Sequence, residues 1–236
     1  TSDLKTQIPQ RCSWRKYTDQ VIEQEKRDKI MEIVRSINSV QDYFKISYIA
    51  EAGNILTPLL IQIIKGAKHV LVFEVLKKEY PMANIAIGVY GELLVLEINK
   101  LSLGTVWLGG DKFTFSSSKI QERMKSENPF PICIPFGYPV NPQVSQHKRK
   151  QQKDIAPEWP QEQMQLFSQI NLAPSAMNKQ PYKLYYQNGT VKIEVQTKDI
   201  QGWPYMDAGI AAAHAIAEFG KGSVTLQDKA LIIANE

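Results

Sequence analysis

The chain has 236 residues, which is enough for one large domain or two small ones with a buried core. Its 43% hydrophobic and 22% charged residues are ordinary for a globular protein and exclude a disordered or fibrous one. The net charge of +4 favours an anionic ligand, but it is far below what indicates a nucleic-acid-binding protein.

Three further features concern the cellular setting. The two cysteines, Cys12 and Cys133, lie far apart, which argues against a disulfide framework or a zinc site and fits a reducing cytoplasm. The first eleven residues have no apolar core and do not form a signal peptide. The apolar run from Ile85 to Ile98 is interrupted and too short to span a bilayer. We therefore expect a soluble, cytoplasmic protein without a metal.

The first part of the chain predicts helices and strands in alternation. In chain order, we expect a helix at 19–37, an apolar stretch at 58–64, a buried strand at 68–76, a core helix at 81–101, a strand at 105–108, a small helix at 119–125 and an extended segment at 131–139. The first helix would be capped by Thr18 or Asp19 and would bury Val21, Ile30, Val34 and Ile37 on one face. The prolines of the extended segment suggest a strand near the edge of a sheet.

The composition then changes. Residues 141–160 are polar, basic and rich in proline, so we expect a linker or a long exposed loop. A helix is expected at 162–170, strands at 183–187 and 190–196 around the hairpin signal Asn188-Gly189, a small-residue helix at 205–219 ending at Gly220, and a closing hairpin at 223–234. The sum is an α+β fold with mixed strands.

The two parts are similar in layout. Each runs through a helix, a loop and a strand region to an apolar helix that ends in glycine. This favours an ancient duplication, with a first half at 1–140, a linker at 141–160 and a partial second half at 161–236.

A basic segment, RCSWRKY, stands just before the first helix. In an extended segment alternate residues point the same way, so Arg11, Ser13 and Arg15 would project together. Two guanidiniums and a hydroxyl suit a phosphate or an electron-rich ring oxygen. The alternative is a surface segment that makes salt bridges.

Two other segments have weak patterns of their own. In APSAMNKQPY, at 173–182, two prolines bracket small and amide residues whose groups suit a planar heterocycle. In LSLGTVWLGG, at 101–110, Gly109 and Gly110 allow a ligand to approach the backbone closely, and Trp107 adds apolar cover. Read alone, each is equally an ordinary connection between a helix and a strand.

Together these segments resemble the nitroreductase family of FMN oxidoreductases. The family patterns RxSxRxY, APSxxNxQPY and a GELL block with an LGG-like turn read here as RCSWRKY, APSAMNKQPY and GELLVLEINKLSLGTVWLGG. PFGYP followed by HKRK is similar to the family's late glycine-tyrosine-proline strand and the basic residue after it. The resemblance implies a nitroreductase-like α+β fold, with a mixed sheet and flanking helices.

The order of the motifs departs from that of ordinary members, in which the PSxxNxQP block directly follows the RxSxR helix. Here Asn38 to Tyr43 hold that place without matching, and the matching block comes at 173–182. Family members form homodimers in which each flavin lies between an RxSxR end and the PSxxN loop of the other subunit. A duplicated chain would keep both within one polypeptide, which implies an intramolecular pseudo-dimer, a monomer in solution and one FMN.

The resemblance also implies which residues bind the cofactor. They are Arg11, Cys12, Ser13, Arg15, Leu108, Gly109, Gly110 and Arg149 from the first half, and Pro174, Ser175, Ala176, Asn178 and Gln180 from the second. Arg11, Ser13 and one of residues 148–150 would hold the phosphate. Arg15 would face the pyrimidine edge of the flavin, where a cation stabilises the negative charge that develops on reduction. No catalytic acid–base residue can be named.

Other candidates are weaker. His214 lies on a small-residue helix, where a histidine is usually a packing or surface residue, and His69 and His147 have no evident partners. The HKRKQQK run lacks interleaved aromatics, so a solvated loop is favoured over an oligonucleotide-binding surface. No GxGxxG or P-loop is present in the sequence.

We therefore expect an enzyme that uses NADH or NADPH for the two-electron reduction of a small acceptor such as a nitroaromatic or a quinone. The alternative is a flavin-binding protein without turnover, acting as a flavin store or an interaction protein. The loss of one PSxxN block favours that alternative.

Overall fold

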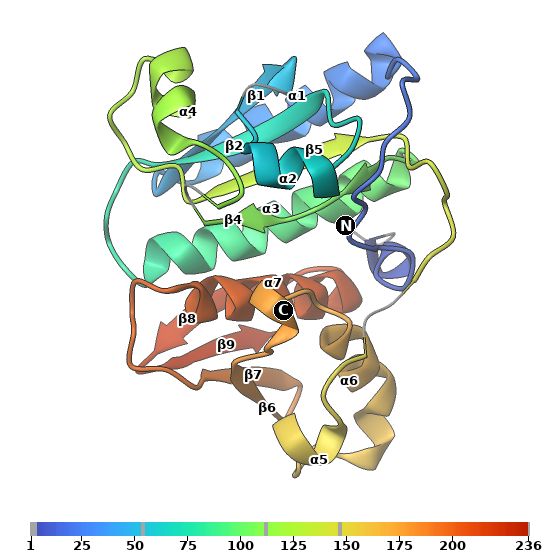
Figure 1. Cartoon of the computed structure of the whole chain (residues 1–236). Coiled ribbons are helices and arrows are strands. Elements are labelled where there is room, and N and C mark those ends of the chain that lie inside the picture. The colour runs from blue at the N-terminus through green and yellow to red at the C-terminus, as the bar shows by residue number, and fades with distance from the viewer. Residues whose placement is uncertain (1–3, 53–54, 111–112, 146–147, 236) are drawn as a thin grey trace. The chain divides into compact units, whose positions relative to one another are not determined.

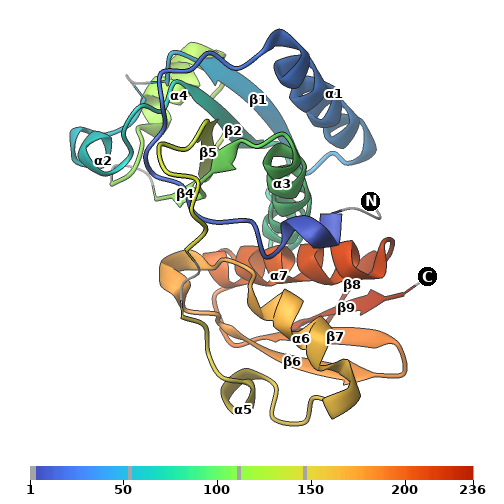
Figure 2. The same cartoon turned by 90° about the vertical axis from the view of Figure 1, so that its right-hand side faces the viewer.

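The computed structural model describes residues 4–52, 55–110, 113–145 and 148–235 (Figures 1 and 2). The chain forms two compact units. The N-terminal unit comprises Arg11–Lys78 and Glu97–Ser145, and the C-terminal unit comprises Thr1–Gln10, Glu79–Leu96 and Gln146–Glu236. These units describe packing and are discontinuous in sequence. The expected halves at 1–140 and 161–236 describe ancestry, and they stay a prediction.

The N-terminal unit is built on an antiparallel sheet. Its strands are β1 (Phe44–Ala50), β2 (His69–Val75), β5 (Ile132–Gly137) and β3 (Gly104–Thr105), in that spatial order, and β4 (Leu108–Gly109) also pairs with β5. Figures 1 and 2 show α1 (Gln24–Val40) on one face of this sheet and α2 (Pro58–Ile63) and α4 (Ser117–Met124) on the other. Beneath α2 and α4, Ile49, Val70, Val72 and Cys133 of the strands pack with Leu60 and Ile120 of the helices.

The first helix begins later than expected. Ile30, Val34 and Ile37 are buried, as predicted, but Val21 is 73% exposed and lies before the helix. The hydroxyl of Thr18 accepts the backbone N–H of Gln20 at 3.3 Å, so it closes a short turn and does not cap α1. The prediction of the face was therefore correct, and that of the start was wrong.

The proline-rich strand lies next to the edge of its sheet, as predicted. β5 has β2 on one side and β3 and β4 on the other. Pro135 is tolerated because it lies between the pairing positions of β3 and β4, at Phe136–Gly137 and Ile132–Cys133. The carbonyl of Pro135 accepts the N–H of Val106 at 3.2 Å. Because the nitrogen and the carbonyl of a strand residue point to the same side, the Pro135 nitrogen also faces this interruption in the pairing, where no N–H donor is required.

The C-terminal unit has a second antiparallel sheet made of two hairpins. In spatial order its strands are β6 (Tyr182–Gln187), β7 (Thr190–Val195), β9 (Ala230–Ala234) and β8 (Ser223–Gln227). Asn188 and Gly189 have φ of 49° and 79°, which confirms the predicted hairpin turn with two left-handed residues. Two antiparallel sheets replace the single mixed sheet that we expected. Among the described residues, parallel pairing occurs in isolated bridges such as Ser13 with Thr105.

Helices complete the C-terminal unit. Here α7 (Trp203–Phe219) lies on the sheet and contacts α6 (Met164–Asn171) and the 3-10 helix η1 (Leu4–Gln7). The shorter elements are α5 (Gln152–Ile155), η3 (Gln161–Gln163) and η4 (Ala176–Asn178). The predicted linker at 141–160 therefore contains α5, and its later part is not an exposed loop, because Ile155, Ala156 and Trp159 are buried.

The most apolar helix, α3 (Met82–Lys100), is a core element, as predicted. By length and composition it would suffice to cross a membrane, contrary to our expectation that the run is too short, but 67% of its apolar window is buried inside the protein. Two glycines allow α3 and α7 to meet. A Cβ added at Gly88 would lie 2.2 Å from the carbonyl oxygen of Met206, and one added at Gly209 would lie 2.5 Å from that of Ile85.

This crossing yields a first prediction. Alanine in place of glycine inside a helix ordinarily stabilises it by about 0.5–1 kcal/mol. We expect the opposite for Gly88→Ala, a loss of about 1–3 kcal/mol in the free energy of unfolding, because the new methyl group meets backbone atoms that cannot rotate away. Urea denaturation measures it, with Ser36→Ala on the exposed face of α1 as the control that leaves stability nearly unchanged. A more stable Gly88→Ala protein would contradict the close approach.

Candidate functional site

Two of the three sequence motifs meet in the N-terminal unit. The RCSWRKY segment runs beside β3, where Ser13 forms a parallel bridge with Thr105 and the N–H of Trp14 donates to the Thr105 carbonyl at 2.9 Å. The ring of Trp14 covers Gly104, since a Cβ there would lie 2.5 Å from it. The structure thus brings the basic segment against the start of the LSLGTVWLGG block.

The two arginines of the basic segment have different surroundings. Arg11 is 3% exposed, whereas Arg15 is exposed and donates one hydrogen bond to the Ser13 carbonyl at 3.2 Å. Between them, the buried thiol of Cys12 donates to the carbonyl of Ser145 at 3.0 Å. Arg15 therefore offers an accessible cation, whereas the side chains of Arg11 and Cys12 are buried.

The LGG turn is held from one side. Leu108 is buried and pairs with Cys133 of β5. The hydroxyl of Thr114 lies 2.8 Å from the carbonyl oxygen of Gly110 and 3.1 Å from that of Gly109. Gly110 has φ of 96°, a conformation that favours glycine. The turn is therefore fixed by contacts to its carbonyl groups.

The third motif lies in the C-terminal unit and has an unusual backbone. Met177, Asn178 and Gln180 have φ of 52°, 56° and 42°, and such left-handed conformations are uncommon for residues other than glycine. Hydrogen bonds hold the loop in this shape: the hydroxyl of Ser175 accepts the N–H of Gln180 at 2.9 Å, and the carboxyl of Asp207 accepts the N–H of Ala176 at 2.9 Å. Backbone strain of this kind concentrates at functional sites.

The basic run is attached to this loop. Arg149 donates to the side-chain oxygen of Asn178 and, at 2.9 Å, to the carbonyl of Leu172. The amide of Asn178 in turn donates to the carbonyl of Lys148 at 2.8 Å. Arg149 thus belongs to the C-terminal unit, with the third motif, and not with Arg11 and Arg15 as the sequence suggested.

Gln180 joins the same two segments. It is fully buried, its side-chain oxygen accepts the N–H of Lys150 at 2.7 Å, and its amide donates to the side chain of Asn171 at 2.7 Å. The ammonium of Lys150 donates to the Gln180 carbonyl at 2.9 Å. These contacts favour a positioning role for Gln180, and direct contact with a cofactor stays a prediction.

Sequence reasoning missed Asp207. This residue is 4% exposed on α7, and burial raises the pKa of its carboxyl to about 7, although the hydrogen bond from Ala176 opposes that shift. The available signal was a single acid in the otherwise apolar stretch YMDAGIAAAHAIA. A buried acid in such a helix requires a partner, and here that partner is the motif loop.

His214 and His69 both have hydrogen-bond partners. His214 is fully buried, with Nδ1 2.9 Å from the carbonyl oxygen of Gln169 and Nε2 3.1 Å from a carboxyl oxygen of Glu92, so it is a packing residue. His69 does have a partner, because its Nδ1 lies 2.6 Å from the hydroxyl of Tyr48. His147 lies outside the described residues. Those residues contain no cluster of three or more metal-ligating side chains.

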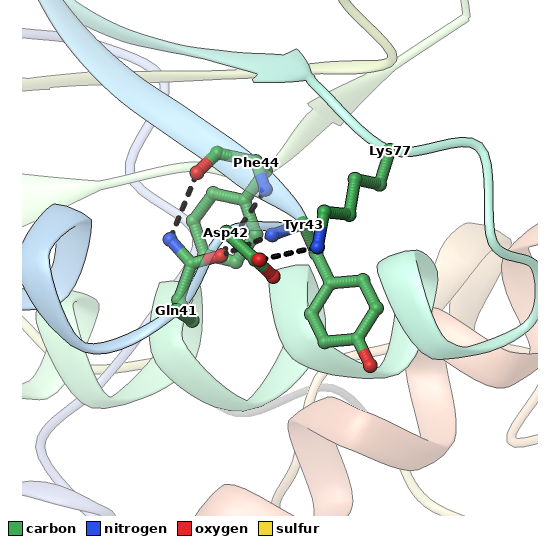
Figure 3. A network of polar contacts seen from close by, with 5 residues as sticks. All are labelled: Gln41, Asp42, Tyr43, Phe44 and Lys77. Carbon is green, nitrogen blue, oxygen red and sulfur yellow. Dashed lines mark hydrogen bonds and ion pairs between the residues drawn. The ribbon is translucent and has the colours of Figure 1, made fainter.

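Residues 38–43 stand where ordinary family members have the PSxxN block; 38–40 end α1, and 41–43 form a turn between α1 and β1 (Figure 3). The side-chain oxygen of Gln41 accepts the N–H groups of Tyr43 and Phe44 at 2.9 and 3.1 Å, and its amide donates to the Phe44 carbonyl at 2.8 Å. Lys77 forms an ion pair with Asp42. The polar groups of this turn thus bind their own backbone and neighbours.

Comparison with known proteins identifies the family. The family model described as "Putative TM nitroreductase" matches residues 3–218, so the chain belongs to this nitroreductase family. No curated protein matches the chain. The family assignment therefore rests on a match over nearly the whole chain, and it confirms the resemblance found in the motifs.

Solved structures show the same fold. A "putative nitroreductase" from Thermotoga maritima has a TM-score of 0.67 at 20% identity, and the match covers 99% of this chain and 94% of that one. A protein from Bacteroides thetaiotaomicron named "Putative NADH dehydrogenase/NAD(P)H nitroreductase" has a TM-score of 0.52 at 17% identity and covers 66% of this chain and 96% of its own. The α+β nitroreductase fold is thus confirmed.

The Asp207 carboxyl yields a second prediction. Because its pKa is raised from 3.8 to about 7, the folded state binds more protons than the unfolded state between these values, and stability falls as pH rises through this window. Asp207→Asn keeps an acceptor for Ala176 without the buried charge. At pH 8 it should stabilise the protein by up to a few kcal/mol, since one pKa unit corresponds to about 1.4 kcal/mol, and at pH 4 its effect should nearly vanish.

Urea denaturation of both proteins at the two pH values measures this difference. Asp199→Asn, at an exposed position, serves as the control and should show little change with pH relative to the unsubstituted chain. An Asp207→Asn effect equal at pH 4 and pH 8 would show that the carboxyl is not raised by burial.

Proposed function

We propose that this chain binds one FMN and uses NADH or NADPH for the two-electron reduction of a small acceptor, such as a nitroaromatic or a quinone. The observation that carries this proposal is the packing of the RCSWRKY segment against the LSLGTVWLGG block, with Ser13 bridged to Thr105. Membership of the nitroreductase family supports it. So does the name of the Bacteroides thetaiotaomicron structure, which refers to an NAD(P)H nitroreductase.

The donor chemistry of the residues fits FMN, which when bound supplies hydride transfer. By the family resemblance, Arg11 and Ser13 would bind the phosphate, and the accessible guanidinium of Arg15 would face the pyrimidine edge. Leu108, Gly109 and Gly110 would border the ring. A guanidinium at that edge stabilises negative charge that develops during reduction.

The basic residues 148–150 have different roles from one another. Arg149 and Lys150 already hold the motif loop, whereas the Lys148 side chain is exposed. We therefore assign the phosphate contact to Lys148 and a positioning role to Arg149. By the family resemblance, the loop residues Pro174, Ser175, Ala176 and Asn178 are also cofactor contacts. We further propose that the chain acts as a monomer in the cytoplasm.

One observation favours the alternative function, a flavin-binding protein without turnover. The segment 38–43 ends α1 and forms a structural turn, and its sequence does not match a PSxxN loop (Figure 3). The absence of one of the family's cofactor loops is consistent with an absence of turnover. Reduction by nicotinamide nucleotides distinguishes the two functions.

The third prediction concerns the cofactor contacts. Arg11→Ala should lower FMN affinity by at least about tenfold, since loss of one charge-assisted hydrogen bond costs roughly 1.5–3 kcal/mol and ~1.4 kcal/mol is one decade. Asn178→Gly, in which glycine tolerates the positive φ, should also lower FMN affinity. Fluorescence titration with FMN measures both.

Lys16→Ala is the matched control, because Lys16 is an exposed cation of the same segment outside the RxSxR pattern. It should bind FMN with nearly unchanged affinity. Normal binding by the Arg11→Ala protein, or an equal loss in all three variants, would contradict the assigned contacts.

The fourth prediction concerns turnover. Under anaerobic conditions NADH or NADPH should bleach the absorbance of the bound flavin, and an added quinone or nitroaromatic should restore it. The reason is that a flavin ring accepts a hydride from the nucleotide and then passes two electrons to the acceptor. Stopped-flow spectroscopy follows both steps. Flavin that dithionite reduces but neither nucleotide reduces would support the alternative function.

A further inference from the structure

The C-terminal unit contains a cavity of about 410 Å³ between the motif loop and the first turn of α7. Asp207 lines it, and so do Met177 and Lys179 of the loop and Asp199, Trp203 and Pro204 of the approach to α7. All of these residues belong to the C-terminal unit, so the cavity is complete within it.

A buried carboxyl is the main polar group of this cavity. Asp207 is 4% exposed, and one of its oxygens accepts the N–H of Ala176 at 2.9 Å. Within the described part of the chain no second hydrogen bond to this carboxyl is found. A carboxylate has about four acceptor positions and leaves much of this capacity open here, so a ligand with N–H donors would satisfy it.

The remaining wall is apolar and aromatic. Met177, Pro204 and Trp203 are among its residues, and Trp203 is 37% exposed. An indole ring attracts a cation over its face, and flat apolar groups pack well against it. The cavity therefore combines an aromatic wall with a carboxyl at its buried end.

The surrounding charges determine the sign of the ligand. Asp199 adds a second carboxylate, which accepts the N–H of Gln201 at 3.0 Å, and the exposed Lys179 supplies the one ammonium among the described lining residues. The Asp207 charge also acts on the buried phenol of Tyr182, whose pKa is raised first by burial and then by that charge, whereas Gln180 and Arg149 lower it. Two carboxylates against one lysine disfavour an anion.

We propose that this cavity is a binding site for a small aromatic cation, an amine or an amidine, whose N–H groups donate to Asp207. The site does not depend on the proposed flavin chemistry, because its residues form it without any cofactor. It therefore gives the protein a second ligand class, of opposite charge to a phosphate.

The experiment is isothermal titration calorimetry of the full chain with benzamidine as the probe, at pH 6 and pH 8. Because the pKa of Asp207 is about 7, its ionised fraction rises about tenfold between these values, and benzamidine affinity should rise by the same factor. Benzamide and benzoate have the same ring but are neutral and anionic. Benzamide should bind weakly with no pH dependence, and benzoate should not bind.

Two variants locate the effect. Asp207→Asn should lower benzamidine affinity at pH 8 by at least about tenfold, a loss of ~1.4 kcal/mol or more, and should abolish the pH dependence. Asp199→Asn should keep the pH dependence, because Asp199 is exposed. Affinity that is equal at pH 6 and pH 8 in the unsubstituted chain, or benzoate binding as well as benzamidine, would overturn the proposal without reference to any variant.

The titration is repeated with saturating FMN. Ala176 lines the cavity and is also a proposed FMN contact, whereas Asp207, Trp203 and Asp199 are not, so we expect nearly the same benzamidine affinity. The result is read from heat and not from flavin reduction, so a protein without turnover still tests the cation site. Complete displacement of benzamidine by FMN would overturn the claim that the cavity is a separate site.

Discussion

The hydrogen bond from the Ala176 N–H to the buried carboxyl of Asp207 is the contact on which the motif loop depends. It ties the loop to α7 at a position where Met177 and Asn178 both have left-handed backbone conformations. Such conformations cost of order 1–3 kcal/mol each and persist only where the surroundings fix them. Gln180 and Arg149 supply the other restraints. The loop is therefore preorganised, and the cost is the burial of the Asp207 carboxyl away from water.

Residues 38–43, where ordinary family members have the PSxxN block, also contain amide side chains, but these bind backbone groups and do not form a ligand loop. Gln41 directs both ends of its amide to the backbone of Tyr43 and Phe44, and Asn38 does the same to both backbone groups of Ile46, at 2.8 and 2.9 Å. Amide side chains used in this way shape a turn and leave little for a ligand. This asymmetry is the physical reason for proposing one cofactor for each chain.

The sequence predicted most of the fold but only part of the site. Apolar and small-residue composition located α3 and α7, and the Asn188-Gly189 pair located the hairpin, because these features depend on local sequence. The prolines correctly placed β5 near an edge, but they did not predict that Pro135 lies in a gap between the pairing positions of two other strands. The contact of Arg149 with Asn178 and the burial of Asp207 depend on folding of distant segments, and no spacing in the sequence encodes them.

The central claim is that one chain holds one FMN without a second copy. Sedimentation velocity of the FMN-loaded protein, followed at the flavin and the protein absorbance, measures both quantities in a single run. We predict a particle of the 26.8 kDa chain mass that carries one flavin. A particle of twice that mass with two equivalent flavins would contradict the account, because twofold symmetry would then come from a second copy.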